Sequence, residues 1–122
     1  MIIRFRGKYK TKDNEGWVYG VPIEKYMIYG MEYNEFYYIE VLPETVGQFT
    51  GQTDKNNVEI YKDDILRDEK GRRFVVTWNN DIGSWVNKPI NKELSYPCFN
   101  VGTVKGLEKL GNIHDNPELV ND

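Results

Sequence analysis

Hydrophobic and polar side chains alternate along several stretches of the chain, most regularly over residues 2–10. Ile3, Phe5 and Tyr9 take one set of alternate positions there, and basic residues take the other. A period of two is typical of a β-strand with one buried face, because successive side chains of a strand point to opposite sides. This stretch is therefore predicted to be a strand with an apolar inner face and a basic outer face.

Other short apolar runs are separated by turn-forming residues and are also predicted to be strands. They cover residues 17–21, 24–29, 35–42, 45–50, 58–61, 65–67, 73–78, 84–86, 98–101 and 107–113. Pro22 is expected to end the first of these strands, because proline cannot donate a ladder hydrogen bond. In the strand 73–78, the alternation predicts that Phe74, Val76 and Trp78 face the interior.

The segments between these runs carry turn signals. Residues 30–34 are expected to form a five-residue hairpin loop, and residues 87–97 a long surface loop. Asn56 and Asn57 are expected at the tip of another loop, because asparagine tolerates the left-handed backbone region. Residues 116–118 (Asn-Pro-Glu) have the chemistry of a helix start, and we expect at most one short C-terminal helical turn there.

The composition agrees with a mainly β chain. The 122 residues include no alanine and only 6 leucines, against 27 valine, isoleucine and threonine residues and 17 aromatic residues. Alanine and leucine favour helices, whereas β-branched and aromatic side chains suit a half-buried strand. A helix bundle is excluded, and we expect an antiparallel β-rich fold.

Length and cysteine content narrow the class of protein further. A chain of 122 residues fits one domain with a core of its own. No apolar run approaches the roughly 20 residues that cross a bilayer, and the N-terminal pattern is not that of a signal peptide. Cys98 is the single cysteine, so an intrachain disulfide and a cysteine-rich zinc site are excluded. We expect a cytoplasmic protein that does not bind membranes.

Charge is distributed unevenly along the chain. Residues 1–12 carry five basic side chains and no acidic one, whereas the remaining residues have a net charge of −8 (11 basic, 19 acidic). The basic positions that form the candidate anion or nucleic-acid contact are Arg4, Arg6, Lys8 and Lys10, with Lys12 beyond them. Alternate cations along a strand suit a phosphate backbone, but they also keep a solvated strand face from pairing with other chains. The acidic remainder favours the second interpretation.

Acidic residues and the single histidine are the candidates for chemistry. A dense acidic group, formed by Asp63, Asp64, Asp68 and Glu69, has the residue types of a metal site or of a general acid–base pair. Carboxylates at tight turns more often bind their own backbone amides. His114 and Cys98 form a nucleophilic pair only if the fold brings them together. We predict no catalytic, metal-binding or cofactor-binding residue and expect no cofactor and no enzymatic activity.

Aromatic residues are concentrated between residues 24 and 42, where they occupy both sets of alternate positions. Base-stacking surfaces interleave aromatic residues with arginine and lysine, whereas the charged residues of this stretch are four glutamates and one lysine. Tyrosine is also enriched in protein interfaces. The candidate protein-interface residues are Tyr26, Tyr29, Tyr33, Phe36, Tyr37 and Tyr38.

Three ordered motifs resemble those of the YopX family. They are residues 3–8 (IRFRGK) with 16–20 (GWVYG), residues 43–51 (PETVGQFTG) with 54–56 (DKN) and 59–61 (EIY), and residues 111–119 (GNIHDNPEL). Asn57 and Asp63 stand where the family usually has glycine. The resemblance implies a protein of bacteriophages or prophages with a mostly β fold, part of which is arranged as a roll or small barrel of SH3 type. We expect a single domain over residues 1–122, with an N-terminal β ribbon over residues 1–42 and the SH3-like roll over residues 43–122 as its sub-structure. It implies no catalytic residue.

These observations favour a non-enzymatic accessory protein that associates with itself or with a host or phage protein. A nucleic-acid-binding β-barrel module that uses the basic strand is the alternative. An enzyme that works through Asp63, Asp64 or His114 is a third and weaker hypothesis.

Overall fold

A computed structural model describes residues 4–24, 27–32, 35–91 and 101–121. The chain forms two compact units, Met1–Phe49 and Thr50–Asp122. It is mainly β with antiparallel strands, as predicted, and its described helical segments are at most four residues long. None of these described helices is long or apolar enough to cross a membrane. The division between the two units falls inside the strand β5 (Gly47–Thr53).

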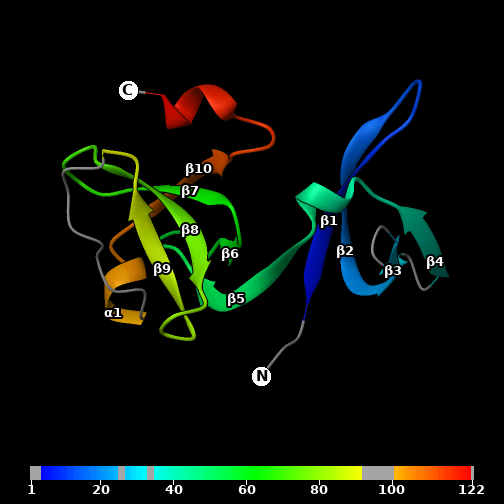
Figure 1. Ribbon diagram of the computed structural model, residues 1–122, viewed down its shortest axis with the longest axis horizontal. Helices are drawn as coiled ribbons and strands as arrows, with labels where there is room; N and C mark the ends of the chain where they lie inside the picture. The colour runs from blue at the N-terminus through cyan, green and yellow to red at the C-terminus, as the bar shows by residue number, and fades with distance from the viewer. Residues whose placement is uncertain (1–3, 25–26, 33–34, 92–100, 122) are drawn as a thin grey trace. The chain divides into compact units, whose positions relative to one another are not determined.

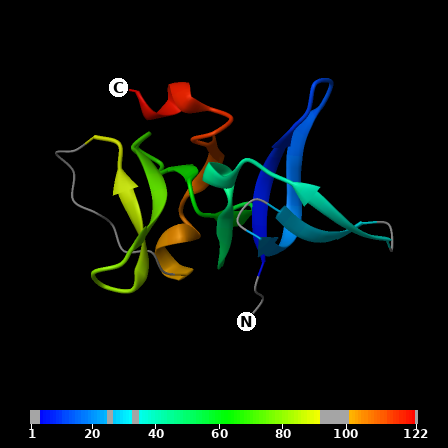
Figure 2. The same cartoon turned by 45° about the vertical axis from the view of Figure 1, so that its right-hand side comes forward.

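The first unit is built from hairpins. Its strands are β1 (Phe5–Lys10), β2 (Glu15–Glu24), β3 (Met27–Glu32), β4 (Glu35–Glu40) and the start of β5, with the 3-10 turn η1 (Pro43–Thr45) before β5. The strand order is β4-β3-β2-β1-β5. The long strand β2 pairs with β1 up to Gly20 and with β3 from Gly20 onward, so it joins the two hairpins (Figures 1 and 2).

Three expectations for the first unit are corrected by the strand register. Pro22 does not end its strand but lies within β2, and the register shifts between Pro22 and Glu24, where an irregularity accommodates a residue without an N–H group. The expected strand 24–29 is divided between β2 and β3. The expected loop 30–34 is also too long, because Glu32 and Glu35 are opposite each other in the β3–β4 ladder.

The second unit contains the rest of β5, the short strand β6 (Glu59–Tyr61) and a four-stranded sheet (Figure 1). The sheet has the order β10-β7-β8-β9, formed by Glu108–Asn112, Asp64–Arg67, Arg73–Asn79 and Ser84–Pro89. The helical turns α1 (Val101–Val104) and η2 (Pro117–Val120) complete it. The core cluster consists of Ile60, Leu66, Phe74, Val76, Val104 and Leu107.

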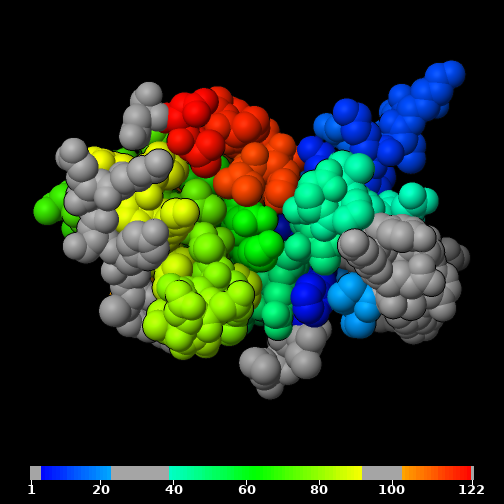
Figure 3. Space-filling view, viewed as in Figure 1, coloured from blue at the N-terminus to red at the C-terminus, as the bar shows by residue number. Residues whose placement is uncertain are grey.

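The structure corrects the expected inner face of β8. Phe74 and Val76 are buried as predicted, but the side chain of Trp78 is 43% exposed. Trp85, its partner in the ladder, packs against the core, and Trp78 packs edge-on against Trp85 with ring centroids 5.2 Å apart. Trp78 thus lies near the tip of the β8–β9 hairpin, which forms part of the surface of this unit (Figure 3).

Two further expectations change in the second unit. Residues 87–89 belong to β9 instead of a surface loop, and Asn87 is fully buried. Val101 begins the turn α1, where the end of a strand was expected. The expected C-terminal helical turn is present as η2, with Pro117 in its first turn.

Candidate interaction surfaces

The basic strand β1 is not a uniformly solvated face. Arg6 is only 2% exposed, and its guanidinium group lies 4.6 Å from the centre of the Trp17 ring. Lys8 is largely covered as well, and its ammonium group is 3.9 Å from the carboxylate of Glu15. Arg4 lies over the ring of Phe49 at 5.8 Å. Lys10 is exposed, whereas the other three predicted contact residues are half-buried or buried.

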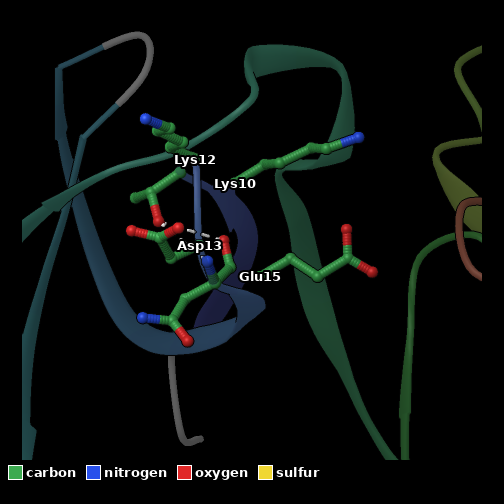
Figure 4. A pocket seen from close by; sticks show the side chains of 6 residues that line it. Lys10, Lys12, Asp13 and Glu15 are labelled. Atoms are coloured by element: carbon green, nitrogen blue, oxygen red, sulfur yellow. Dashed lines mark hydrogen bonds between the residues drawn. The ribbon is translucent and has the colours of Figure 1, made fainter.

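A shallow depression lies at the tip of the β1–β2 hairpin, lined by residues 10–15. Lys10 and Lys12 contribute positive charge to it, and Asp13 and Glu15 contribute negative charge. The two lysine side chains extend in different directions (Figure 4). Because the cations do not converge and carboxylates are interspersed, this tip does not form a concentrated anion site.

The central YopX-like motif attaches η1 to the middle of β1. The hydroxyl of Thr45 accepts a hydrogen bond from the Lys8 amide at 2.8 Å and donates one to the Leu42 carbonyl at 2.6 Å. The Leu42 amide in turn donates to the Lys8 carbonyl. Thr45 is 4% exposed, so these bonds satisfy polar groups that water does not reach. This part of the motif has a structural role.

Asp54 and Asp68 begin two turns of the same construction. In each turn, one carboxylate oxygen accepts the backbone N–H groups two and four residues later, as predicted for turn-forming carboxylates. The fourth residue has positive φ in both turns, 62° for Asn57 and 82° for Gly71. Asn57 therefore takes the left-handed conformation expected of it at the tip.

The two turns differ in their surroundings. Asp54 is 1% exposed, and its second oxygen accepts the backbone amide of Lys109 at 2.8 Å. Burial raises the pKa of Asp54, but the hydrogen bonds from the N–H groups of Lys109, Val58 and Asn56 together lower it by more. The net pKa of Asp54 therefore lies below its ordinary value. Asp68 is near the surface and is paired with the Arg72 side chain at 2.6 Å. Asp54 thus joins its turn to β10.

Asp64 forms a buried ion pair with Lys109. The carboxylate of Asp64 is fully buried and lies 2.9 Å from the Lys109 ammonium group. It also accepts the backbone amide of Tyr61 at 2.7 Å. Lys109 donates to the Glu59 carbonyl and lies over the Tyr61 ring. The acidic group of the sequence is therefore dispersed among separate structural contacts.

His114 lies beside Asp63, with 3.1 Å between Nε2 and the carboxylate oxygen. Asp63 has a positive φ of 71°, and its backbone bonds to Val76 and Ile113 hold the turn in place. Cys98, the other member of the proposed nucleophilic pair, lies outside the described residues. Within the described ranges, no three His, Cys, Asp or Glu side chains are grouped to hold a metal ion.

The predicted aromatic interface falls on β3 and β4. Tyr29 is opposite Tyr38 in the ladder, and Met31 is opposite Phe36. Tyr37 is opposite Gly30 and belongs to the other set of alternate positions along β4. Tyr26 and Tyr33 lie outside the described residues.

An exposed apolar pair on β2 extends this interface, and it was not among the predicted site residues. Tyr19 is 45% exposed and Val21 is 52% exposed. Val21 is opposite Tyr29, which is itself opposite Tyr38, so the three positions form one row across β2, β3 and β4. The alternation of Trp17, Tyr19 and Val21 was the available sequence signal. We define the outer face of the first unit by the positions Tyr19, Val21, Tyr29, Met31, Phe36 and Tyr38.

Comparison with known proteins confirms the family resemblance. A family model described as YopX protein matches residues 5–121. No curated protein matches the chain. Among solved structures, the chain is similar to the crystal structure of protein EF1440 from Enterococcus faecalis, with 23% identity and a TM-score of 0.48. That comparison covers 95% of this chain and 75% of the other.

Proposed function

The chain belongs to the YopX family, and from this premise we propose that it is a phage- or prophage-encoded accessory protein that acts as a non-enzymatic protein-interaction module. Its site of action in this proposal is the cytoplasm of the bacterial host. The interaction surface is the outer face of the first unit.

The observation that carries the proposal is the pair of exposed apolar residues on β2 of the first unit. Tyr19 and Val21 are about half exposed on β2, and the row that contains Val21 continues with Tyr29 and Tyr38. Positions opposite each other in antiparallel strands belong to the same face of a sheet. Exposed apolar residues that adjoin on one face mark interaction sites, whereas singly scattered ones are common on any protein.

The composition of this face also supports a protein partner. Tyrosine, phenylalanine and methionine are enriched in protein interfaces, and charged residues are confined to the rim. Glu40 lies at one end of the β3–β4 ladder and occupies the same set of alternate positions as Phe36 and Tyr38. A carboxylate at this end of the face disfavours nucleic acid as the partner.

The polar groups of the second unit support a non-enzymatic role. Asp64 is paired with Lys109, Asp54 holds backbone amides, and His114 contacts Asp63. Each of these contacts connects segments distant in sequence. Their contribution to the stability of the unit explains why these polar groups are present, and no catalysed reaction is needed to explain them.

A pair of matched substitutions tests the proposal. Val21→Asp places a charge on the outer face, and Val58→Asp makes the same change at a valine that is 44% exposed on the second unit. We expect proteins captured from a lysate of phage-carrying host cells to fall about tenfold with Val21→Asp, which corresponds to about 1.4 kcal/mol. Val58→Asp is expected to leave capture unchanged. Equal recovery by the wild type and both variants, with folding confirmed by circular dichroism, would refute the proposal.

A further inference from the structure

The strand β4 ends the strand order of the first unit and, among the described strands, pairs with β3 alone. Its sequence is Glu-Phe-Tyr-Tyr-Ile-Glu. Natural edge strands are usually protected by charged side chains (above all lysine), by proline or by a bulge, because their outward N–H and C=O groups are a template for another strand. In β4 the charged residues are Glu35 and Glu40, at its two ends. β4 contains neither lysine nor proline, and its ladder with β3 is regular over all six residues.

We infer that a second copy of this chain pairs with β4, edge to edge and antiparallel, to form a two-fold symmetric dimer. This inference goes beyond the proposed function, because it concerns the main-chain edge of β4 and not the outer face. Addition of a strand to a sheet edge is a common mode of recognition in which the main chain supplies the hydrogen bonds. A two-fold axis makes such an edge its own partner, since each residue of one copy meets the equivalent chemistry in the other.

The geometry of antiparallel pairing limits the register of this dimer. Along a strand, the N–H and C=O groups of successive residues point alternately to its two neighbours, and residues directly opposite each other are either both hydrogen-bonded or both not. Two copies related by a two-fold axis must therefore oppose residues of the same parity. Near the middle of β4 the axis then passes beside Tyr37 or beside Tyr38, so that this tyrosine faces itself.

This restriction removes the electrostatic objection to self-pairing. The near-palindromic alignment would place Glu35 opposite Glu40 of the partner subunit, and it is excluded because the two residues differ in parity. With the axis at Tyr37, Phe36 is opposite the partner's Tyr38 and Glu35 is opposite the partner's Ile39. With the axis at Tyr38, Tyr37 is opposite the partner's Ile39 and Phe36 is opposite the partner's Glu40. Both registers pair an aromatic residue with its own copy, and such cross-strand pairs are favourable.

Disulfide capture tests both the partner and the register. In the 122-residue chain with Cys98→Ser, we would introduce Tyr37→Cys, Tyr38→Cys or, as a control, Val58→Cys on the second unit. Directly opposed residues have Cβ atoms about 4.5–5.5 Å apart, which is at most about 1 Å beyond the range of about 3.5–4.5 Å in disulfides, so a small movement of the strands allows the bond. We expect one of the two tyrosine positions to cross-link in mild oxidant to twice the 14.4 kDa chain mass. The other tyrosine position and Val58→Cys are expected to cross-link at least about tenfold more slowly.

The mass in solution provides the independent measurement. We expect light scattering to give twice 14.4 kDa at high concentration for the wild type, and 14.4 kDa for Tyr37→Lys and Tyr38→Lys variants that retain their circular dichroism. A wild type that stays at 14.4 kDa, or equal cross-linking at all three cysteine positions, would overturn the inference.

A monomer whose capture of other proteins still depends on Val21 overturns the edge dimer and leaves the proposed function standing. If the wild type and Val21→Asp both form the dimer, and no captured protein depends on Val21, the proposed role of the outer face is refuted. The inferred β4 dimer then still stands.

Discussion

Replacement of Asp54 by asparagine is expected to destabilise the second unit far more than the same change at Asp68. The two residues begin turns of the same construction, but Asp54 is 1% exposed and accepts three backbone N–H groups, at 2.8, 2.9 and 2.8 Å from Asn56, Val58 and Lys109. Asparagine keeps the shape and has one acceptor oxygen in place of two. Its amide group would face either the Lys109 N–H or the turn, donor against donor.

The magnitude follows from these bonds. A hydrogen bond to a charged group contributes about 1.5–3 kcal/mol, and a buried donor left unpaired adds its own desolvation cost. Loss of the bond from Lys109, with weakening of the other two, gives an expected cost of about 2–4 kcal/mol for Asp54→Asn. Asp68→Asn loses a surface contact to Arg72 and frees groups that water reaches, so its cost is expected to be about 1 kcal/mol or less.

The pH dependence gives a second test. The pKa of Asp54 is lowered in the folded state, so its contribution to stability is present above the unfolded-state pKa of about 3.9 and is lost as pH falls through the folded-state pKa. The difference in the free energy of unfolding between wild type and Asp54→Asn is therefore expected to shrink between pH 5 and pH 3. The size of this change is set by the difference between the folded-state and unfolded-state pKa of Asp54. Urea unfolding at pH 7, 5 and 3, followed by circular dichroism and tryptophan fluorescence, measures these differences. Costs of Asp54→Asn and Asp68→Asn that agree within about 0.5 kcal/mol at pH 7 would refute the reasoning, because differences of that size are usual at unimportant surface positions.

Three further predictions concern stability. Arg6→Ala is expected to cost about 2–3 kcal/mol in urea unfolding, because Arg6 is buried against an aromatic ring, whereas Lys10→Ala should change stability by less than about 0.5 kcal/mol; similar effects would contradict a structural role for Arg6. Gly111→Ala introduces a Cβ that would clash with the side-chain oxygen of Asn116, at an expected cost of about 1–3 kcal/mol in the free energy of unfolding. This cost should largely disappear when Asn116 is also replaced by alanine, and additive effects of the two substitutions would exclude the clash. Gly71→Ala is expected to raise the free energy of the folded state by about 1–2 kcal/mol because φ is +82° there, and Gly71→Asn by less; thermal melting that ranks alanine as the better residue would contradict this.

Local patterns in the sequence determined the type and approximate place of most elements. The period of two identified β1 and β8, and the asparagine pair identified the bend at Asn57, where the backbone takes positive φ. These features depend on residues within a few positions of one another, so the chain encodes them locally. The three YopX-like motifs likewise identified the family from sequence alone.

Contacts between distant residues decided the rest. The alternation in β1 predicts that Arg6 faces water, but the neighbouring strand brings Trp17 beneath its guanidinium group and the residue is buried. Alternation also predicts an inward Trp78, but the core ends before the hairpin tip and leaves that ring partly exposed. Periodicity specifies which side of a strand a residue lies on, and only the packing of other elements determines whether that side is covered.

The same distinction applies to the candidate sites. Composition located the aromatic residues between residues 24 and 42, whereas the register of β2, β3 and β4 determined that Val21, Tyr29 and Tyr38 form one row. The acidic residues of the second unit were visible in the sequence, but only the fold separated Asp64, bound to Lys109, from Asp63, beside His114. Strand register and buried ion pairs join residues tens of positions apart, and their energies depend on a geometry that exists only after the chain has folded.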